Sequence, residues 1–344
     1  MISPGCRVMA VVKSEAYGHG LREIAAKLDQ LGVDWFGVGD VWEGKELREI
    51  TSKPILLLEP THPNELKIAA TLRITPSISN IEALRAFANA CAEIGEKRDF
   101  HINVNTGMNR HGCNPLQIPQ LTEIAEASPV SISGLWTHFA ASKIQSEEHS
   151  KQLQRFNNVV EQYLKANPSE EKKTIFHAGS SSDLAFPDTH FGMIRVGAAI
   201  YGIESSLANR LKPVMSIRTR VSHITEEPIG DQASYFPFDN QMLPKRLAAV
   251  DIGYFWGKSR SESDGSGQVL LNGKKCRVVK KIGMDVTLID ISELPDVKRW
   301  DIVTVLGVDK DQSISAFEIA KQSEQIPYEV VCSLGRTLNR KLID

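Results

Sequence analysis

The chain carries a lysine at a place where it could react with a carbonyl compound. Lys13 follows a short apolar run, residues 8–12, and opens the octapeptide KSEAYGHG. An ammonium group held against apolar neighbours loses hydration, so we expect the neutral amine that a Schiff base needs to be available near pH 7. Lysine, tyrosine and glycines together suggest a carbonyl cofactor that carries phosphate. The simpler alternative is a lysine at a strand end that points into water.

The elements that would position this lysine can be read from the pattern of apolar residues. In the first two hundred residues, short apolar runs alternate with amphipathic stretches, such as residues 21–28 and 82–87, that predict helices. The runs predict eight strands, at residues 7–13, 35–40, 54–60, 73–78, 100–106, 130–139, 173–179 and 191–197. We therefore predict an α/β fold with a parallel (β/α)8 barrel, in which catalytic groups lie at the carboxyl ends of strands.

The pattern changes after about residue 211. Period-two segments rich in β-branched residues occupy 215–224, 246–254, 276–291 and 301–306, and one helical segment lies at 316–321. We expect two domains, a barrel over residues 1–211 and a β-rich C-terminal domain over residues 212–344.

Composition excludes several function classes. Among 344 residues, 40 Lys and Arg nearly balance 42 Asp and Glu, so no global field attracts nucleic acid or an anionic membrane. A small-molecule substrate fits better. The five cysteines are odd in number and form no CxxC pair, which argues against a disulfide framework or a metal site. No apolar stretch approaches the roughly 18 residues of a membrane span, and we expect a cytoplasmic protein.

At this point the residues carry a resemblance. The octapeptide is similar to the cofactor-lysine motif of the alanine racemases, which are pyridoxal 5'-phosphate (PLP) enzymes built from a barrel and a β domain. Nine further peptides resemble family signatures in the family's order, at residues 106–110, 136–139, 177–181, 193–197, 201–202, 234–235, 252–254, 283–285 and 328–329. One such peptide is weak evidence, but ten in order make coincidence a poor explanation.

The resemblance implies how PLP is held. Lys13 would carry the cofactor, and Arg195 would face its pyridine nitrogen without giving up a proton, because guanidinium stays protonated. The other implied cofactor residues are Tyr17, Arg110, His138, Ser181, Gly197, Ala198 and Tyr328. His177 resembles a residue that supports the arginine. Taken alone, the serine run at 180–182 would more often cap a helix, and Arg195 would be a structural ion-pair partner.

The resemblance also implies two bases, since racemisation removes a proton on one face and returns one on the other. Lys13 would be the first base and Tyr235 the second, with His138 as the hydrogen-bonding partner of the phenol. In the family that tyrosine comes from the partner subunit, which implies a homodimer with shared sites. Arg110, Tyr254 and Met284 match substrate contacts. Without the family, Tyr235 would be read as a strand aromatic.

Several residues depart from the family's pattern. Asn103 stands where many members carry a carbamylated lysine that orients the arginine, here Arg110, and Asn105 replaces an acidic residue. Two potential negative charges are therefore missing from this strand. Phe255 and Trp256 suggest a bulkier, more apolar entrance. Only twelve residues precede Lys13, so we expect either a start further upstream or that residues 205–211 cover the resulting gap.

These observations predict a PLP-dependent isomerase that interconverts L- and D-alanine for cell-wall precursor supply. The rival on the same fold is a racemase of other or broader amino-acid substrates. A non-catalytic PLP-carrying protein is a rival from another class, although such proteins consist of a single barrel. A PLP decarboxylase or aldolase would need different residues in the second domain.

Overall fold

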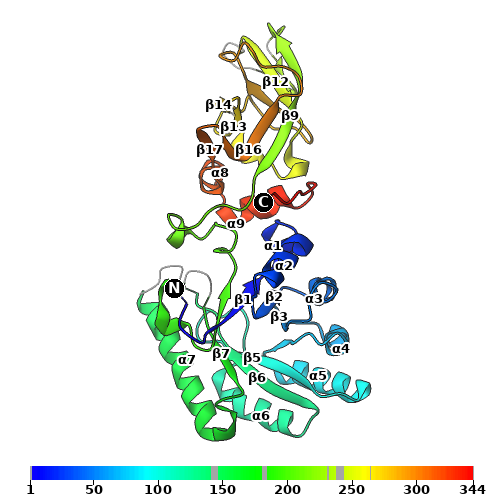
Figure 1. Cartoon of the computed structure of the whole chain (residues 1–344), viewed down its shortest axis with the longest axis vertical. Coiled ribbons are helices and arrows are strands. Elements are labelled where there is room, and N and C mark those ends of the chain that lie inside the picture. The colour runs from blue at the N-terminus through cyan, green and yellow to red at the C-terminus, as the bar shows by residue number, and fades with distance from the viewer. Residues whose placement is uncertain are drawn as a thin grey trace. The chain divides into compact units, whose positions relative to one another are not determined.

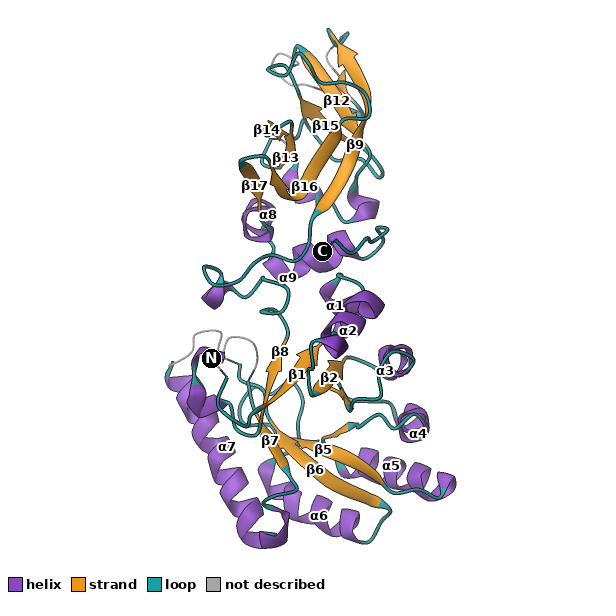
Figure 2. Ribbon diagram, in the orientation of Figure 1, coloured by secondary structure: helices purple, strands orange, loops and turns teal. Residues whose placement is uncertain are grey.

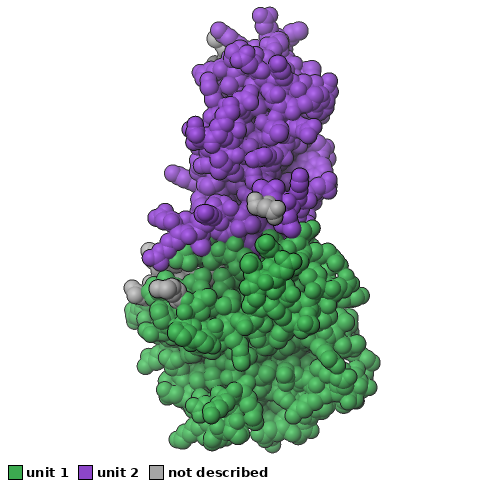
Figure 3. Space-filling view, viewed as in Figure 1, with its two compact units in different colours: residues 1–16, 21–200, 204–207 green, residues 17–20, 201–203, 208–344 purple. Residues whose placement is uncertain are grey.

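The computed structural model describes residues 2–140, 146–179, 184–230, 232–237, 244–263 and 265–343. The chain forms two compact units, coloured separately in Figure 3. The first contains residues 1–16, 21–200 and 204–207, and the second contains residues 17–20, 201–203 and 208–344.

Within the described residues, eight parallel strands form the centre of the first unit (Figure 1). They are β1 (Arg7–Val11), β2 (Trp35–Val38), β3 (Ile55–Leu57), β4 (Ser77–Ile78), β5 (Arg98–Asn103), β6 (Val130–Trp136), β7 (Ile175–His177) and β8 (Met193–Val196). Their order is β3-β2-β1-β8-β7-β6-β5-β4. The ring closes just before β4, where Thr75 donates its N–H to Ile55 O (2.8 Å) and accepts from Leu57 N–H (2.9 Å). The predicted barrel is confirmed.

Helices surround these strands, as Figure 2 shows. They are α2 (Leu21–Gln30), α3 (Val41–Arg48), α4 (Leu66–Thr71), α5 (Ile81–Ile94), α6 (Ile118–Glu126) and α7 (Glu147–Ala166). The segment labelled α1 (Lys13–Tyr17) differs, because its inner residues have left-handed dihedral angles. The sequence specifies helix ends locally: Asn80 caps α5 by accepting from Ala83 N–H (2.8 Å), and Gly95 ends it at φ +70°. Between β8 and β9 (Ile217–Glu226), where residues 205–211 were expected to cover a gap, the described chain forms a 3-10 turn, Ser205–Leu207.

The second unit is an antiparallel sheet with two helices in its described part. Its strands are β9 (Ile217–Glu226), β12 (Arg246–Val250), β13 (Gln268–Leu271), β14 (Lys274–Arg277), β15 (Thr287–Asp290), β16 (Ile302–Asp309) and β17 (Gln312–Ile314), with a hairpin of β10 (Gln232–Ala233) and β11 (Phe236–Pro237). The order is β14-β13-β16-β9-β12-β15, and β17 pairs with β16. The predicted β-rich C-terminal domain is confirmed.

Two details of this unit differ from the sequence prediction. Residues 276–291 are not one strand: β14 ends at Arg277, and the chain turns at Lys280 (φ +55°) before β15 begins. The prediction also missed a helix. Besides α8 (Ala316–Ser323), the unit contains α9 (Pro327–Gly335), whose buried Val330 and Val331 are residues typical of strands. No helix in the described ranges is long and apolar enough to cross a membrane.

A buried ion pair lies within the second unit. Lys258 and Glu262 pair with each other, and both side chains are essentially inaccessible to solvent. The Lys258 N–H donates to Gly253 O (3.1 Å), and Glu262 O accepts from Gly267 N–H (2.8 Å). The pair therefore ties together the loop that follows Gly253.

Removing one partner of this pair should be costly, because it leaves an uncompensated buried charge. We expect Lys258→Met to lower the free energy of unfolding by about 3–5 kcal/mol. The double variant Lys258→Met/Glu262→Met should recover most of that loss. Lys275→Met, which breaks a partly exposed pair with Glu318 (2.8 Å), should cost less than about 1 kcal/mol. Urea unfolding of the full chain measures all three, and equal losses for Lys258→Met and Lys275→Met would contradict the expectation.

Candidate active site

The segment that follows Lys13 is strained. Ser14, Glu15, Ala16 and Tyr17 all have φ between +52° and +57°, and each such residue costs about 1–2 kcal/mol in a left-handed conformation. Strain of this kind persists only where the surroundings impose it, and it clusters at functional sites.

Glu43, on α3, holds this turn. Its carboxylate accepts from Gly39 N–H (2.8 Å) and from Glu15 N–H (3.2 Å), so it satisfies donors on two segments at once. Burial raises the pKa of Glu43, and the hydrogen bonds from Gly39 and Glu15 oppose that rise. The carboxylate thus joins the end of β2 to the turn after the reactive lysine.

Lys13 itself meets a carboxylate. Its Nζ donates to Glu59 Oε1 at 2.8 Å, and the two side chains are 31% and 35% exposed. The other oxygen of Glu59 lies 3.2 Å from His111 Nε2. Burial alone would raise the pKa of Glu59, but the hydrogen bond and charge of Lys13, with the charges of Arg110 and His111, hold it below its usual value.

The sequence interpretation of Lys13 was therefore incomplete. It expected apolar surroundings, and the structure adds a negative charge from the end of β3. Glu59 and His111 were missed as candidates. The signal for Glu59 was present, because it lies in the apolar run 54–60 at a strand's carboxyl end, where a barrel places its working groups.

Arg195, on β8, is a buried cation held by neutral acceptors. Its guanidinium donates to Thr137 O (2.9 Å), Gly179 O (2.5 Å) and His177 Nδ1 (2.8 Å). It also lies 4.6 Å from the centre of the Trp136 ring. These contacts fix the plane of the guanidinium, and they confirm that His177 touches this arginine.

Two further histidines complete this arrangement. His177 Nδ1 accepts from Arg195, so its Nε2 carries the hydrogen and donates to His101 Nδ1 (2.9 Å). Arg195 is also 3.3 Å from His138 Nδ1. Burial, followed by the charge of Arg195, lowers the pKa of His101 and of His138 to about 3, and lowers that of His177 well below its usual value. All three imidazoles are therefore neutral near pH 7.

The structure brings several predicted residues to one end of the barrel. A small hollow of about 20 Å³, large enough for one water molecule, lies at the carboxyl ends of β5 and β6. It is lined by Leu58, Asn103, Val104, Asn105, Thr106, Met108, Arg110, His111, Trp136 and His138. Gly197 and Ala198 directly follow β8. The predicted Ser181 lies outside the described residues.

The remaining predicted residues belong to the second unit. Tyr17 lies with its ring 4.9 Å from Tyr201 and 6.3 Å from Tyr328, so the two predicted phosphate-binding phenols are neighbours. Tyr254 and Met284 are also brought together. Tyr254 N–H donates to Gly283 O (3.0 Å) and the next residue, Phe255, donates to Met284 O (3.0 Å).

Tyr235 also belongs to the second unit. It occupies the turn of the β10–β11 hairpin, next to Ser234 at φ +56°, and it is 88% exposed.

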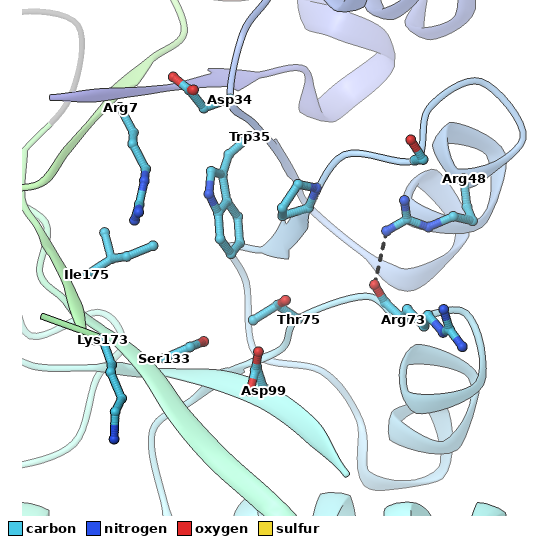
Figure 4. A pocket seen from close by; sticks show the side chains of 12 residues that line it. Arg7, Asp34, Trp35, Arg48, Arg73, Thr75, Asp99, Ser133, Lys173 and Ile175 are labelled. Carbon is cyan, nitrogen blue, oxygen red and sulfur yellow. Dashed lines mark hydrogen bonds between the residues drawn. The ribbon is translucent and has the colours of Figure 1, made fainter. Parts of the chain in front are cut away.

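The opposite end of the barrel carries a larger hollow of about 730 Å³, whose lining includes the first residues of three strands, Arg7, Trp35 and Ile175 (Figure 4). Trp35 stands at its centre, and Arg48 is held in its wall by donating to Arg73 O (3.0 Å). None of the predicted site residues lines it. Among the described residues, no cluster of histidine, cysteine and acidic side chains could hold a metal ion.

Comparison with known proteins agrees with this geometry. Residues 1–205 match the family model of the alanine racemase N-terminal domain, and residues 214–342 match that of the C-terminal domain. The chain belongs to the alanine racemase family. It is 33% identical to an alanine racemase of Methylacidiphilum infernorum, over 97% of this chain and 85% of that protein, and 33% identical to one of Nostoc sp., over 98% and 90%.

Solved structures of the family have the same fold. An alanine racemase of Clostridium difficile has a TM-score of 0.87 at 28% identity, over 96% of this chain and 87% of that chain. An alanine racemase of Bartonella henselae with covalently bound pyridoxal phosphate has a TM-score of 0.81 at 25% identity, over 99% and 93%.

The residues of this chain fit such a cofactor chemically. Lys13 offers an amine at the carboxyl end of a barrel strand, and Arg195 offers a guanidinium whose orientation is fixed by buried acceptors. Backbone N–H groups after β8 and the phenols of Tyr17 and Tyr328 are donors of the type that a phosphate dianion needs.

The role of Glu43 in holding the turn after Lys13 can be tested by Glu43→Gln. The glutamine side chain has one oxygen, so its NH₂ group would face either the Gly39 N–H or the Glu15 N–H and leave that donor unsatisfied. We therefore expect a loss of about 1–3 kcal/mol in the free energy of unfolding. The matched control is Glu46→Gln on the same helix, which breaks an exposed pair with Arg22 (2.8 Å) and should cost below about 1 kcal/mol. Urea unfolding compares them, and indistinguishable midpoints would contradict this role.

Proposed function

We propose that this protein is a PLP-dependent alanine racemase that interconverts L-alanine and D-alanine. The observation that carries the proposal is that the barrel contains both Lys13, which lies at its mouth, and Arg195, a buried guanidinium held by neutral acceptors. The names of the relatives and of the matching structures support the choice of alanine.

When bound, PLP withdraws electrons from the α-carbon of an attached amino acid and so acidifies its α-hydrogen. In this proposal Arg195 donates a hydrogen bond to the pyridine nitrogen of the cofactor. A guanidinium only donates hydrogen bonds, so a ring nitrogen facing it remains an acceptor and receives no proton. The fixed acceptors Thr137 O and Gly179 O keep its N–H groups oriented. Arg110 and the donors after β8 would bind the anionic groups of the cofactor.

Two residues of this chain would move the proton. Lys13 Nζ would accept the α-hydrogen on one face, and Tyr235 Oη would serve the other face. His138 supports the phenol in this proposal: its Nδ1 faces Arg195, so its Nε2 carries a hydrogen that can donate to a phenolate. Its imidazole, with a pKa lowered to about 3, stays neutral throughout the working range of pH.

We further propose a homodimer in which Tyr235 acts in the site of the partner subunit. The 88% exposure of this tyrosine, on a short hairpin, supports a role at another molecule's surface. A cytoplasmic location and a role in cell-wall precursor supply belong to the same proposal. All five cysteines are free thiols, which is typical of a reducing compartment.

A racemase of broader substrate range is the second candidate. Phe255 and Trp256, whose rings meet edge to face at 4.9 Å, lie beside Tyr254 and favour a more apolar entrance. Chiral amino-acid analysis across a panel of L-amino acids separates the two candidates. Conversion confined to alanine supports the first.

The proposal predicts that the protein converts L-alanine to D-alanine, and that Lys13→Ala abolishes this activity. Borohydride reduction in the presence of PLP, followed by peptide mapping, should place a pyridoxyl group on Lys13. Lys67, in an exposed surface pair with Glu93, is an internal control that should stay unlabelled. Labelling elsewhere, or no turnover of any amino acid by a labelled protein, would contradict the proposal.

The two-base arrangement predicts an asymmetric effect of Tyr235→Phe. Removal of the phenol should impair solvent-deuterium exchange from one enantiomer of alanine more than from the other, while PLP stays bound. Mixing Tyr235→Phe with Lys13→Ala protein should restore activity through heterodimers that contain one intact site. If mixed dimers form without any activity, both bases come from one chain.

A further inference from the structure

Glu59 is a carboxylate that the two-base scheme does not use, although it touches the reacting nitrogen. It lies two residues after the end of β3, and its two oxygens bridge separate parts of the barrel mouth. Oε1 accepts from Lys13 Nζ at 2.8 Å, and Oε2 lies 3.2 Å from His111 Nε2.

We propose that Glu59 is the counter-ion of Lys13 and tunes this lysine as the base for one of the two enantiomers. The inference rests on the proposed function for the part that Lys13 plays. The new element is that the strength of this base is set by a carboxylate that follows β3.

The direction of the effect follows from charge. When Lys13 Nζ accepts an α-hydrogen as a proton, the C–H bond breaks, an N–H bond forms and the electron pair remains on the substrate. The nitrogen gains a positive charge, and a carboxylate 2.8 Å away stabilises it. The same carboxylate disfavours the neutral amine, so it opposes covalent attachment of a carbonyl group at Lys13.

A carboxylate is much too weak a base to take the lysine proton outright. The usual pKa values of the two groups differ by about six units in water. Where Lys13 carries no carbonyl group, the two side chains therefore form an ion pair, and Glu59 acts by holding charge and not by transferring a proton.

Other charges also face this pair from the elements around it. Arg110 and His111, after β5, act on Glu59, and both members of the pair act on His138, after β6. Most of them are positive or neutral. Glu59 is the carboxylate that lies in hydrogen-bond contact with Lys13, so its removal changes the local charge at Nζ most directly.

The experiment compares the full-length protein with Glu59→Gln, which keeps the size of the side chain and removes its charge. Each protein is equilibrated with PLP at a series of pH values and reduced with borohydride, and labelled Lys13 peptide is quantified. We expect the pH midpoint of labelling to fall by about 0.5–1 unit in Glu59→Gln, a threefold to tenfold change in the attachment equilibrium.

The control is Glu93→Gln, which removes a carboxylate from the exposed pair with Lys67 at 2.7 Å and should leave the midpoint unchanged. If Glu59→Gln does not fold, as judged by thermal unfolding, Glu59→Ser makes the same comparison with a smaller neutral side chain.

A second readout is solvent-deuterium exchange into each enantiomer of alanine. Glu59→Gln should slow exchange from the enantiomer that Tyr235→Phe spares, by about threefold to tenfold, and should affect the other enantiomer less. A merely structural role would slow both equally.

The outcomes separate the two proposals. Labelling of Lys13 with the same midpoint in wild type and Glu59→Gln overturns the role of Glu59 and leaves the racemase proposal standing. Equal slowing of both enantiomers overturns it as well. No labelling of Lys13 in the wild-type protein overturns the proposed function together with this inference.

Discussion

The barrel is arranged around one buried positive charge. A guanidinium inside a protein is costly unless its N–H groups are satisfied, and Arg195 meets this constraint with carbonyl oxygens and an imidazole. The neighbouring rings must then be neutral, as the lowered pKa of His177 indicates. This constraint also affects β6. His177 donates to His101, and the His101 ring lies 2.6 Å from the position that a Cβ at residue 134 would occupy. Glycine is therefore required at Gly134.

The mouth of the barrel shows a different balance of charge. The resemblance identified two negative charges missing from β5, at Asn103 and Asn105. The structure supplies a carboxylate just after β3: Glu59 contacts Lys13, and its pKa is lowered by Lys13 and, less strongly, by Arg110. The effect of Asn103 on Arg110 remains a prediction. The charges at the barrel mouth come from segments that are distant in sequence, so the residues of one strand do not determine them.

This arrangement explains what could be predicted from sequence and what could not. Apolar runs and their ends located the strands and Lys13, because burial and strand period are local properties. The partnership of Lys13 with Glu59 is not local: β1 and β3 are separated by β2, and only the curvature of the closed ring brings their ends together. Similarly, the valines of α9 favour a strand locally, and the helix forms because it buries them. Family resemblance suggested the roles of Tyr235, Tyr254 and Met284, and these remain proposals.

The turn after Lys13 links the reactive lysine to a second set of contacts. Gly18, at φ +78°, packs so closely that a Cβ there would lie 2.5 Å from Val331 O on α9. The same helix carries Tyr328, whose ring neighbours that of Tyr17. Four left-handed residues, Ser14 to Tyr17, precede Gly18, and each of them restricts the local backbone. Within the second unit the Tyr17 ring neighbours those of Tyr201 and Tyr328, whereas within the first unit the Lys13 amine contacts a carboxylate.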